Sequence, residues 1–159
     1  MAENQHLESR SPGFESGKVW VNGVELYYER VGRGEHVLLL MPGAVASIRS
    51  SFQPQLDTLD REIFTLVAFD PRGYGWSRPP RRDFPEDFLL RDARDGRELM
   101  RALGYSRFSI LGWCAGGISA LLLAATYPDD VNKLVVWGSF AYMTDTLVDT
   151  FESTGHFVF

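Results

Sequence analysis

The chain has 159 residues, of which 45% are hydrophobic and 23% charged, and this composition is typical of one globular domain, not of a disordered or fibrous protein. The net charge of -5 argues against a basic surface for nucleic acid or for an acidic membrane. The single cysteine excludes an internal disulfide framework and favours a reducing compartment. Residues 1–10 match neither a signal peptide nor an Arg-rich transit peptide, so we expect the protein in the cytoplasm.

The N-terminal part of the chain predicts a tail followed by a hairpin. Residues 1–16 are polar and predict a mobile tail. Over Lys18–Arg30, apolar residues alternate with others on both sides of Asn22-Gly23. This dipeptide favours a type I′ turn because both turn positions need positive φ. We therefore expect two antiparallel strands here.

Apolar segments bounded by turn residues then alternate with amphipathic ones. The apolar segments predict buried parallel strands at His36–Met41, Ile63–Phe69, Phe108–Leu111 and Lys133–Trp137. The segments between them predict a short helix at Phe52–Asp60 and longer helices at about Pro85–Leu103 and Gly116–Tyr127. This alternation predicts an α/β fold, with a parallel sheet flanked by helices behind the N-terminal hairpin.

The strongest chemical motif is the segment L-G-W-C-A-G-G at positions 111–117, between a predicted strand and a predicted helix. It matches the Gly-x-nucleophile-x-Gly elbow of the α/β-hydrolases, with Cys114 where most members have Ser. The tight turn needs small neighbours, which Gly112 and Gly116 supply. The side chain of Cys114 would stand at a helix N-terminus, where the dipole favours an anion such as a thiolate. The alternative is a structural cysteine in a glycine-rich turn.

A second segment, Pro42-Gly43-Ala44, follows the first predicted parallel strand. In this fold that loop supplies one oxyanion-hole N–H, and the residue after the nucleophile supplies the other. We therefore predict an oxyanion hole made by the backbone N–H groups of Ala44 and Ala115. Backbone donors place no demand on the side chain, so two alanines are acceptable. The alternative is an ordinary turn at the end of a strand.

A third segment, D-P-R-G-Y-G-W-S at positions 70–77, resembles the D-x-R-G-x-G-x-S loop of the same superfamily. The resemblance implies that Asp70 and Arg72 hold this loop together. Ser77 is then a turn residue and not a nucleophile.

Several segments together resemble the valacyclovir hydrolase (biphenyl hydrolase-like) family over roughly Lys18–Asp145. They are Val21–Val24, Phe69–Gly75 with Ser77–Pro80, Asp83–Phe88, Leu111–Trp113 and Val136–Gly138. The resemblance implies an α/β-hydrolase fold and hydrolysis of a small-molecule ester of an α-amino acid by a Ser-His-Asp triad, with no cofactor and no metal. Membership also leaves a mitochondrial location open.

The elbow departs from the family pattern at two positions. The family has G-W-S-D-G-G, whereas this chain has Cys114 and Ala115 in place of Ser and Asp. In the family this Asp anchors the α-ammonium group of the substrate, and Ala115 cannot pair with an amine. The preference for amino-acid esters is therefore not expected to carry over. A nucleophilic cysteine is compatible with the fold, since dienelactone hydrolases resemble this arrangement.

The downstream half of the triad is the third departure. In α/β-hydrolases the acid and the His follow the nucleophile on later strands. His156 is the only downstream histidine and lies near the end of the chain, while His6 and His36 lie upstream. None of the three is predicted to be the base.

These features predict that residues 17–145 form the N-terminal half of an α/β-hydrolase domain, without the lid and final sheet units, and that residues 146–159 are an irregular tail. Such a chain would be a weak or inactive hydrolase. The alternative is a non-catalytic chain that acts through an exposed sheet edge, including self-association. A nucleotide-binding module is disfavoured, because the elbow glycines lack the G-x-G-x-x-G spacing and the chain has no Walker lysine.

Overall fold

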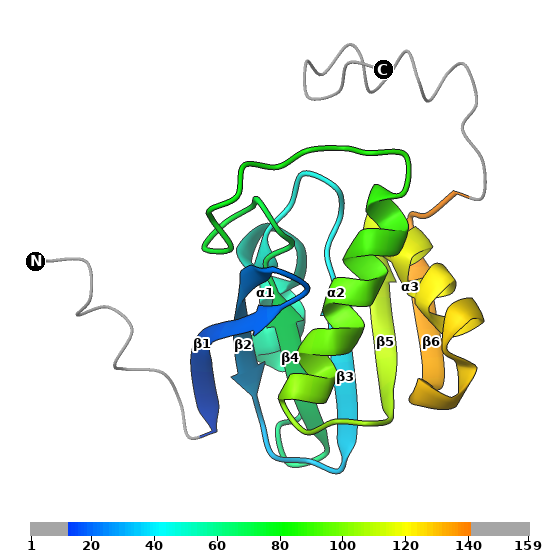
Figure 1. Cartoon of the computed structure of the whole chain (residues 1–159). Coiled ribbons are helices and arrows are strands. Elements are labelled where there is room, and N and C mark those ends of the chain that lie inside the picture. Colours follow the sequence, from blue (N-terminus) through cyan, green and yellow to red (C-terminus); the bar gives the residue numbers. More distant parts are fainter. Residues whose placement is uncertain (1–12, 141–159) are drawn as a thin grey trace, which may run out of the picture.

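The computed structural model describes residues 13–140, which form a six-stranded mixed sheet with helices on both faces (Figure 1). In chain order the elements are β1 (Phe14–Val21), β2 (Val24–Val31), β3 (His36–Met41), α1 (Ile48–Thr58), β4 (Phe64–Phe69), α2 (Phe88–Ala102), β5 (Phe108–Trp113), α3 (Ala115–Thr126), the short 3-10 helix η2 (Pro128–Asp130) and β6 (Val131–Trp137).

The strands lie in the order β1-β2-β4-β3-β5-β6. β3, β4, β5 and β6 are mutually parallel, which confirms the predicted α/β architecture, while β2 pairs antiparallel with both β1 and β4. Because parallel strands end at the same edge of the sheet, the loops after β3, β4 and β5 all emerge at one end of the molecule (Figure 1). The predicted chemistry is concentrated at this end.

The N-terminal hairpin forms as predicted but begins earlier. Asn22 and Gly23 have φ values of 46° and 78° and form the two-residue turn between β1 and β2. β1 starts at Phe14, which pairs with Val31, so residues 14–16 belong to the sheet and not to the predicted tail. Positions 1–12 of the predicted tail lie outside the described residues, as do the predicted domain end after residue 140 and the tail at 146–159.

Alternate residues of the sheet pack into two separate cores. Helices α2 and α3 cover one face, where Leu39 and Met41 of β3 contact buried residues such as Leu99. Helix α1 covers the opposite face, where Leu40 packs with Phe52. The central strands β3 and β4 are therefore largely buried on both faces, as continuous apolar runs predict. The prediction of a buried strand at Lys133–Trp137 is wrong for burial: β6 is largely exposed, because it lies at the edge of the sheet and pairs only with β5 among the described strands.

Two predicted helix boundaries differ from the structure. α1 begins at Ile48, four residues before the predicted start, because its first turn is capped: Asp70 accepts a hydrogen bond from the Ile48 N–H at 2.9 Å. α2 begins at Phe88 instead of Pro85, since the residues between them form a single turn in which the Pro85 carbonyl accepts from the Phe88 N–H. The C-terminal ends agree with prediction to within two residues.

Candidate active site

Cys114 lies at the junction between β5 and α3, where the sequence places a nucleophile. Its backbone has φ 54° and ψ -127°, and apart from Asn22 in the hairpin turn it is the only non-glycine residue with positive φ in the described chain. Such a conformation costs about 1–3 kcal/mol and persists only where the surroundings hold it. The thiol is partly exposed. The chain therefore has a strained strand-to-helix turn that carries a partly exposed thiol.

The glycines of the elbow are required by close backbone approaches. A Cβ at Gly116 would lie 2.1 Å from the Met41 carbonyl oxygen, and one at Gly112 would lie 2.7 Å from the Cα of Gly117. Both distances are far below a van der Waals contact, so no side chain fits at either position. The predicted roles of Gly112 and Gly116 in permitting the turn thus have a direct steric basis.

The loop after β3 lies against the elbow. Met41 pairs with Gly112 in the sheet register. The space where Gly43 would carry a Cβ is bordered by the Trp113 ring at 3.2 Å and by the Cβ of Cys114 at 3.4 Å. The predicted oxyanion loop and the predicted nucleophile are therefore neighbours at the same end of the sheet. Ala44 lies in this loop, and Ala115 is the first residue of α3, where N–H groups lack intrahelical acceptors.

The end of β6 and the residues after it form hydrogen bonds with the backbone of the elbow, and the sequence did not predict this contact. The Cys114 N–H donates to the Trp137 carbonyl oxygen at 3.1 Å, and the Ser139 hydroxyl donates to the Cys114 carbonyl oxygen at 2.9 Å. Both backbone groups of the strained residue are thus bonded to one short segment. The only sequence signal was a Gly-Ser pair after a predicted strand, which gives no indication of a partner 25 residues away.

The side chains of Asp70 and Ser77 in the loop after β4 form hydrogen bonds that hold the loop in place, as predicted for Asp70. The buried Asp70 carboxylate accepts from the Trp76 N–H at 2.8 Å as well as from Ile48, so it joins the loop to the start of α1. Burial raises the pKa of the Asp70 carboxyl, and these two backbone donors act against that rise. Ser77 is fully buried: its hydroxyl donates to the Asp70 carbonyl at 2.6 Å and accepts from the Tyr27 N–H at 2.8 Å.

Arg72 forms a buried ion pair with Asp95 of α2. Two guanidinium nitrogens contact the two carboxylate oxygens at 2.6 and 2.7 Å, and Asn22 of the hairpin turn donates to the same carboxylate at 3.0 Å. The hydrogen bond with Asp95 raises the Arg72 pKa, with its burial acting in the opposite direction. These contacts connect the hairpin, the loop and α2 at the end of the sheet that carries Cys114.

The histidines are not brought to the elbow within the described chain. His36 is exposed at the start of β3, opposite the end where Met41 meets Gly112, and its ring lies 6.0 Å from that of Phe64. His6 and His156 lie outside the described residues. Between residues 13 and 140 there is no group of three metal-ligating side chains and no helix long and apolar enough to cross a membrane.

Comparison with known proteins supports this reading of the fold. Residues 36–157 match the family model described as alpha/beta hydrolase fold. The chain is 57% identical over 130 residues to Serine hydrolase BPHL of Mus musculus and 55% identical to that of Homo sapiens, in each case covering 82% of this chain and 45% of the relative. The chain thus spans less than half the length of these curated relatives.

A solved hydrolase from Pseudomonas aeruginosa PA01 superposes with a TM-score of 0.72 at 24% identity, covering 92% of this chain and 53% of that one, which shows the shared fold. The identity to Serine hydrolase BPHL confirms the resemblance predicted from the sequence motifs. With the family match covering most of its length, the chain belongs to the alpha/beta hydrolase fold family.

Proposed function

We propose that this chain carries the nucleophile and oxyanion half of a carboxylic-ester hydrolase site, with Cys114 as the nucleophile. The observation that carries the proposal is the backbone of Cys114: a φ of 54° at a strand–helix junction, held through both its N–H and its carbonyl. A merely structural cysteine would have no need of such strain. The similarity to Serine hydrolase BPHL supports the ester-hydrolase class.

The proposed chemistry is acyl transfer to sulfur. The Cys114 sulfur attacks the ester carbonyl carbon, and the backbone N–H groups of Ala44 and Ala115 stabilise the oxyanion that forms. The carbon–oxygen bond to the alcohol then breaks, the alcohol leaves with the proton of the thiol, and an acyl thioester remains on Cys114. Water must attack this thioester to complete hydrolysis.

Deacylation is the step that the chain is proposed to perform poorly. An efficient enzyme activates water with a positioned base, which contributes about 10²–10⁴-fold. The described residues place no imidazole at the elbow, because His36 lies at the other end of β3. We therefore expect acylation of Cys114 in a single burst, followed by slow turnover. The proposed location of this activity is the cytoplasm.

The proposed substrate is an ester without an essential α-ammonium group. Ala115 presents a methyl group where the valacyclovir hydrolase family has a carboxylate, so nothing at this position would pair with the amine of an amino-acid ester. Introducing Ala115→Asp should raise the use of a valine ester relative to an uncharged ester of similar size. Ala115→Asn, which has the same shape but no charge, is the matched control.

The test is a burst assay on the full chain with a p-nitrophenyl ester and a valine ester. We expect one equivalent of alcohol released per chain, a thioester on Cys114 by mass spectrometry, and no burst from Cys114→Ala. Cys114→Ser should give no sustained esterase activity, although it restores the nucleophile of the family. Multiple turnovers that disappear in His156→Ala would overturn the proposed slow deacylation.

A second candidate function is non-catalytic association through β6. This strand pairs only with β5 among the described strands, and Val135 is 55% exposed on it. Under this alternative the chain would associate with a partner sheet, and its assembly would be unaffected by Cys114→Ala.

A further inference from the structure

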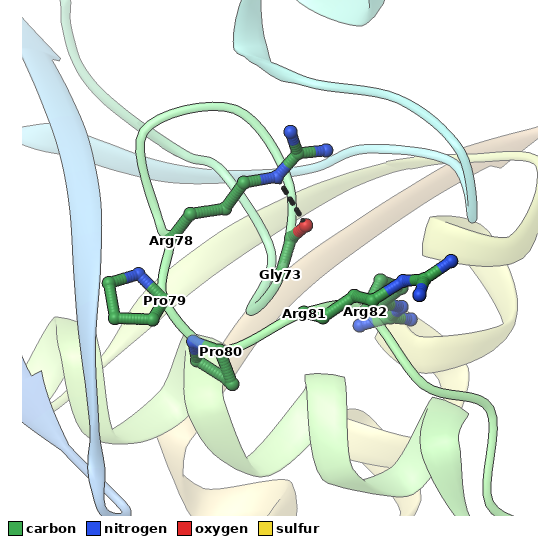
Figure 2. Close-up of a pocket in the computed structure, with 6 residues that line it drawn as sticks. All are labelled: Gly73, Arg78, Pro79, Pro80, Arg81 and Arg82. Atoms are coloured by element: carbon green, nitrogen blue, oxygen red, sulfur yellow. Dashed lines mark hydrogen bonds between the residues drawn. The ribbon is translucent and has the colours of Figure 1, made fainter.

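The loop after β4 encloses a surface pocket with a strongly basic lining, shown in Figure 2. The pocket is lined by Gly73, Arg78, Pro79, Pro80, Arg81 and Arg82, and no carboxylate is among these residues. Three arginine residues thus line one pocket of a chain whose net charge is -5. Because the loop follows β4, the pocket lies at the active-site end of the sheet.

Two of these arginines have no carboxylate partner within residues 13–140. Arg78 is exposed and donates its Nε–H to the Gly73 carbonyl at 2.8 Å, which fixes the stem of the side chain, while its terminal nitrogens make no ion pair with a described carboxylate (Figure 2). Arg81 is exposed and makes no ion pair with a described residue. Most other arginines of the described chain do pair with a carboxylate, whereas Arg61, Arg94 and Arg107 do not. The pairs are Arg30 with Glu15, Arg33 with Glu62, Arg49 with Glu29, Arg72 with Asp95, Arg91 with Asp83, and Arg97 and Arg101 with Asp130.

The side chain of Arg82, which lines the pocket, is held in place by several contacts. Its side chain is only 5% exposed and forms a two-point ion pair with Asp92 at 2.6 and 2.8 Å. The guanidinium carbon also lies between 5.1 and 5.6 Å from three aromatic ring centroids, those of Tyr74, Phe84 and Phe88. With both terminal nitrogens occupied, the buried Nε–H of Arg82 is left without an acceptor in the described structure.

The carboxylates around this loop are already engaged. Asp70 accepts two backbone N–H groups, Asp83 pairs with Arg91, and Asp92 pairs with Arg82. None of them forms an ion pair with Arg78 or Arg81, although the charge of Arg78 acts to lower the pKa of the Asp70 carboxyl. The two exposed guanidinium groups can therefore still pair with an anion from outside the described chain.

We propose that this pocket binds an oxyanion, and specifically a phosphate group. Guanidinium groups recognise phosphate and carboxylate oxygens through paired N–H donors. Two exposed guanidiniums without an ion-pair partner carry more charge than one carboxylate can neutralise, whereas a phosphate offers more oxygens and up to two charges. The pocket is independent of Cys114 chemistry, so the proposal stands or falls separately from the proposed function.

The test is calorimetric titration of the full chain with inorganic phosphate and with pyrophosphate at low ionic strength. We expect saturable 1:1 binding that weakens at least about tenfold in Arg78→Gln/Arg81→Gln, since charge-assisted hydrogen bonds to both side chains are lost. Arg94→Gln is the matched control, because Arg94 is exposed on α2, away from the pocket lining. Circular dichroism of each variant checks that it is folded, and Arg78→Lys/Arg81→Lys should retain part of the affinity.

A second arm distinguishes a soluble phosphate from a lipid headgroup. Vesicles of phosphatidylcholine with and without a phosphoinositide are sedimented with the same variants. Binding to the phosphoinositide that is lost in the double Gln variant assigns the phosphate to a lipid, and binding in solution only assigns it to a small molecule. Absence of binding in both arms, or an equal loss in Arg94→Gln, would overturn the proposed site.

Discussion

The hydroxyl of Ser139 lies 2.9 Å from the carbonyl oxygen of Cys114, and this hydrogen bond connects the residue after the edge strand with the strained residue of the elbow. The same Ser139 oxygen occupies the space beside Gly117, where a Cβ would approach it to 1.8 Å. Ser139 therefore acts on both sides of the turn: it holds the Cys114 backbone and fills the room that a side chain at position 117 would need.

Removing the Ser139 hydroxyl should loosen the elbow. Ser139→Ala loses one hydrogen bond, for which we expect a loss of about 1 kcal/mol in the free energy of unfolding. Iodoacetamide should alkylate Cys114 faster in the folded chain than in the denatured chain, because the thiol stands at a helix N-terminus. This difference should shrink in Ser139→Ala, because only the bond from the Cys114 N–H to the Trp137 carbonyl then connects the elbow to the segment after β6. Ser109→Ala in β5 is the control and should leave the alkylation rate unchanged. Equal rates in wild type and Ser139→Ala would contradict this role.

Gly117→Ala should be strongly destabilising, and part of the loss should depend on Ser139. The added methyl group would overlap the Ser139 oxygen. Overpacking of this kind lowers the free energy of unfolding by about 1–3 kcal/mol. In Gly117→Ala/Ser139→Ala the oxygen is gone and the nearest remaining Ser139 atom is its Cβ at 3.0 Å. The double variant should therefore be more stable than the sum of the single effects, as measured by urea unfolding. Strict additivity would show that the clash is relieved elsewhere.

The ion pair between Arg72 and Asp95 provides a test of the loop's structural role. Both side chains are largely buried, at 13% and 1% exposure, so Asp95→Ala leaves an uncompensated guanidinium and should cost about 3–5 kcal/mol. Arg72→Met/Asp95→Leu should recover much of this loss, since replacing a buried pair by apolar residues is often neutral. Arg33→Ala is the control: its pair with Glu62 is exposed, and we expect at most about 1 kcal/mol. All variants are compared by urea unfolding.

The sequence motifs predicted the parts of the fold that depend on local chemistry. The elbow around Cys114 was recognisable because steric demands on Gly112 and Gly116 leave a fixed spacing of glycines. The hairpin was recognisable because Asn22-Gly23 supplies two positive φ values. Continuous apolar runs identified β3 and β4, because burial on both faces removes the polar alternation of an exposed sheet. The same kind of run located β6 but not its exposure, since position at the edge of the sheet is not visible in the sequence.

Contacts between distant segments could not be predicted in the same way. Ser139 reaches Cys114 only because β6 pairs with β5 in a register that sets Trp137 beside Trp113. The start of α1 was missed because its capping acceptor, Asp70, comes from the end of β4. Likewise Asp95 lies on the buried side of α2, where periodicity alone would place an apolar residue, because Arg72 arrives there from another loop.

Stability at high pH should depend on Tyr28. Burial, the hydrogen bond to Glu15 and the charge of Glu15 raise the pKa of Tyr28 from 10.0 to about 12. Because the folded pKa lies above the unfolded value, the protonated phenol stabilises the fold fully below pH 10, and this contribution is lost as the pH rises from about 10 through 12. Tyr28→Phe should therefore flatten the fall of the unfolding free energy in this range. Tyr127→Phe is the control, and an unchanged slope in Tyr28→Phe would contradict the assignment.

The two edges of the sheet should differ in their tendency to associate. β6 forms one edge of the sheet, beyond β5. Its apolar residues Val135, Val136 and Trp137 are 55%, 36% and 37% exposed. Leu121 of α3, the helix that packs against β6, is also 45% exposed. An apolar edge strand with unpaired N–H and carbonyl groups is a template for another chain. β1, the opposite edge, exposes Trp20, which pairs with Glu25 of β2 and lies two residues from Lys18, and such charges discourage pairing with another chain.

We therefore expect the 159-residue chain to self-associate at micromolar concentrations through β6 and to melt with a transition that depends on protein concentration. Val135→Lys should weaken the association about tenfold or more in sedimentation velocity, because a buried, unpaired ammonium group at the new interface is strongly unfavourable. Trp20→Lys, a comparable change at the other edge, should have little effect. A sharp, reversible melt that is independent of concentration, together with a monomeric sedimentation profile, would show that β6 is not an association surface. An equal effect of both lysines would instead indicate non-specific association through exposed apolar groups.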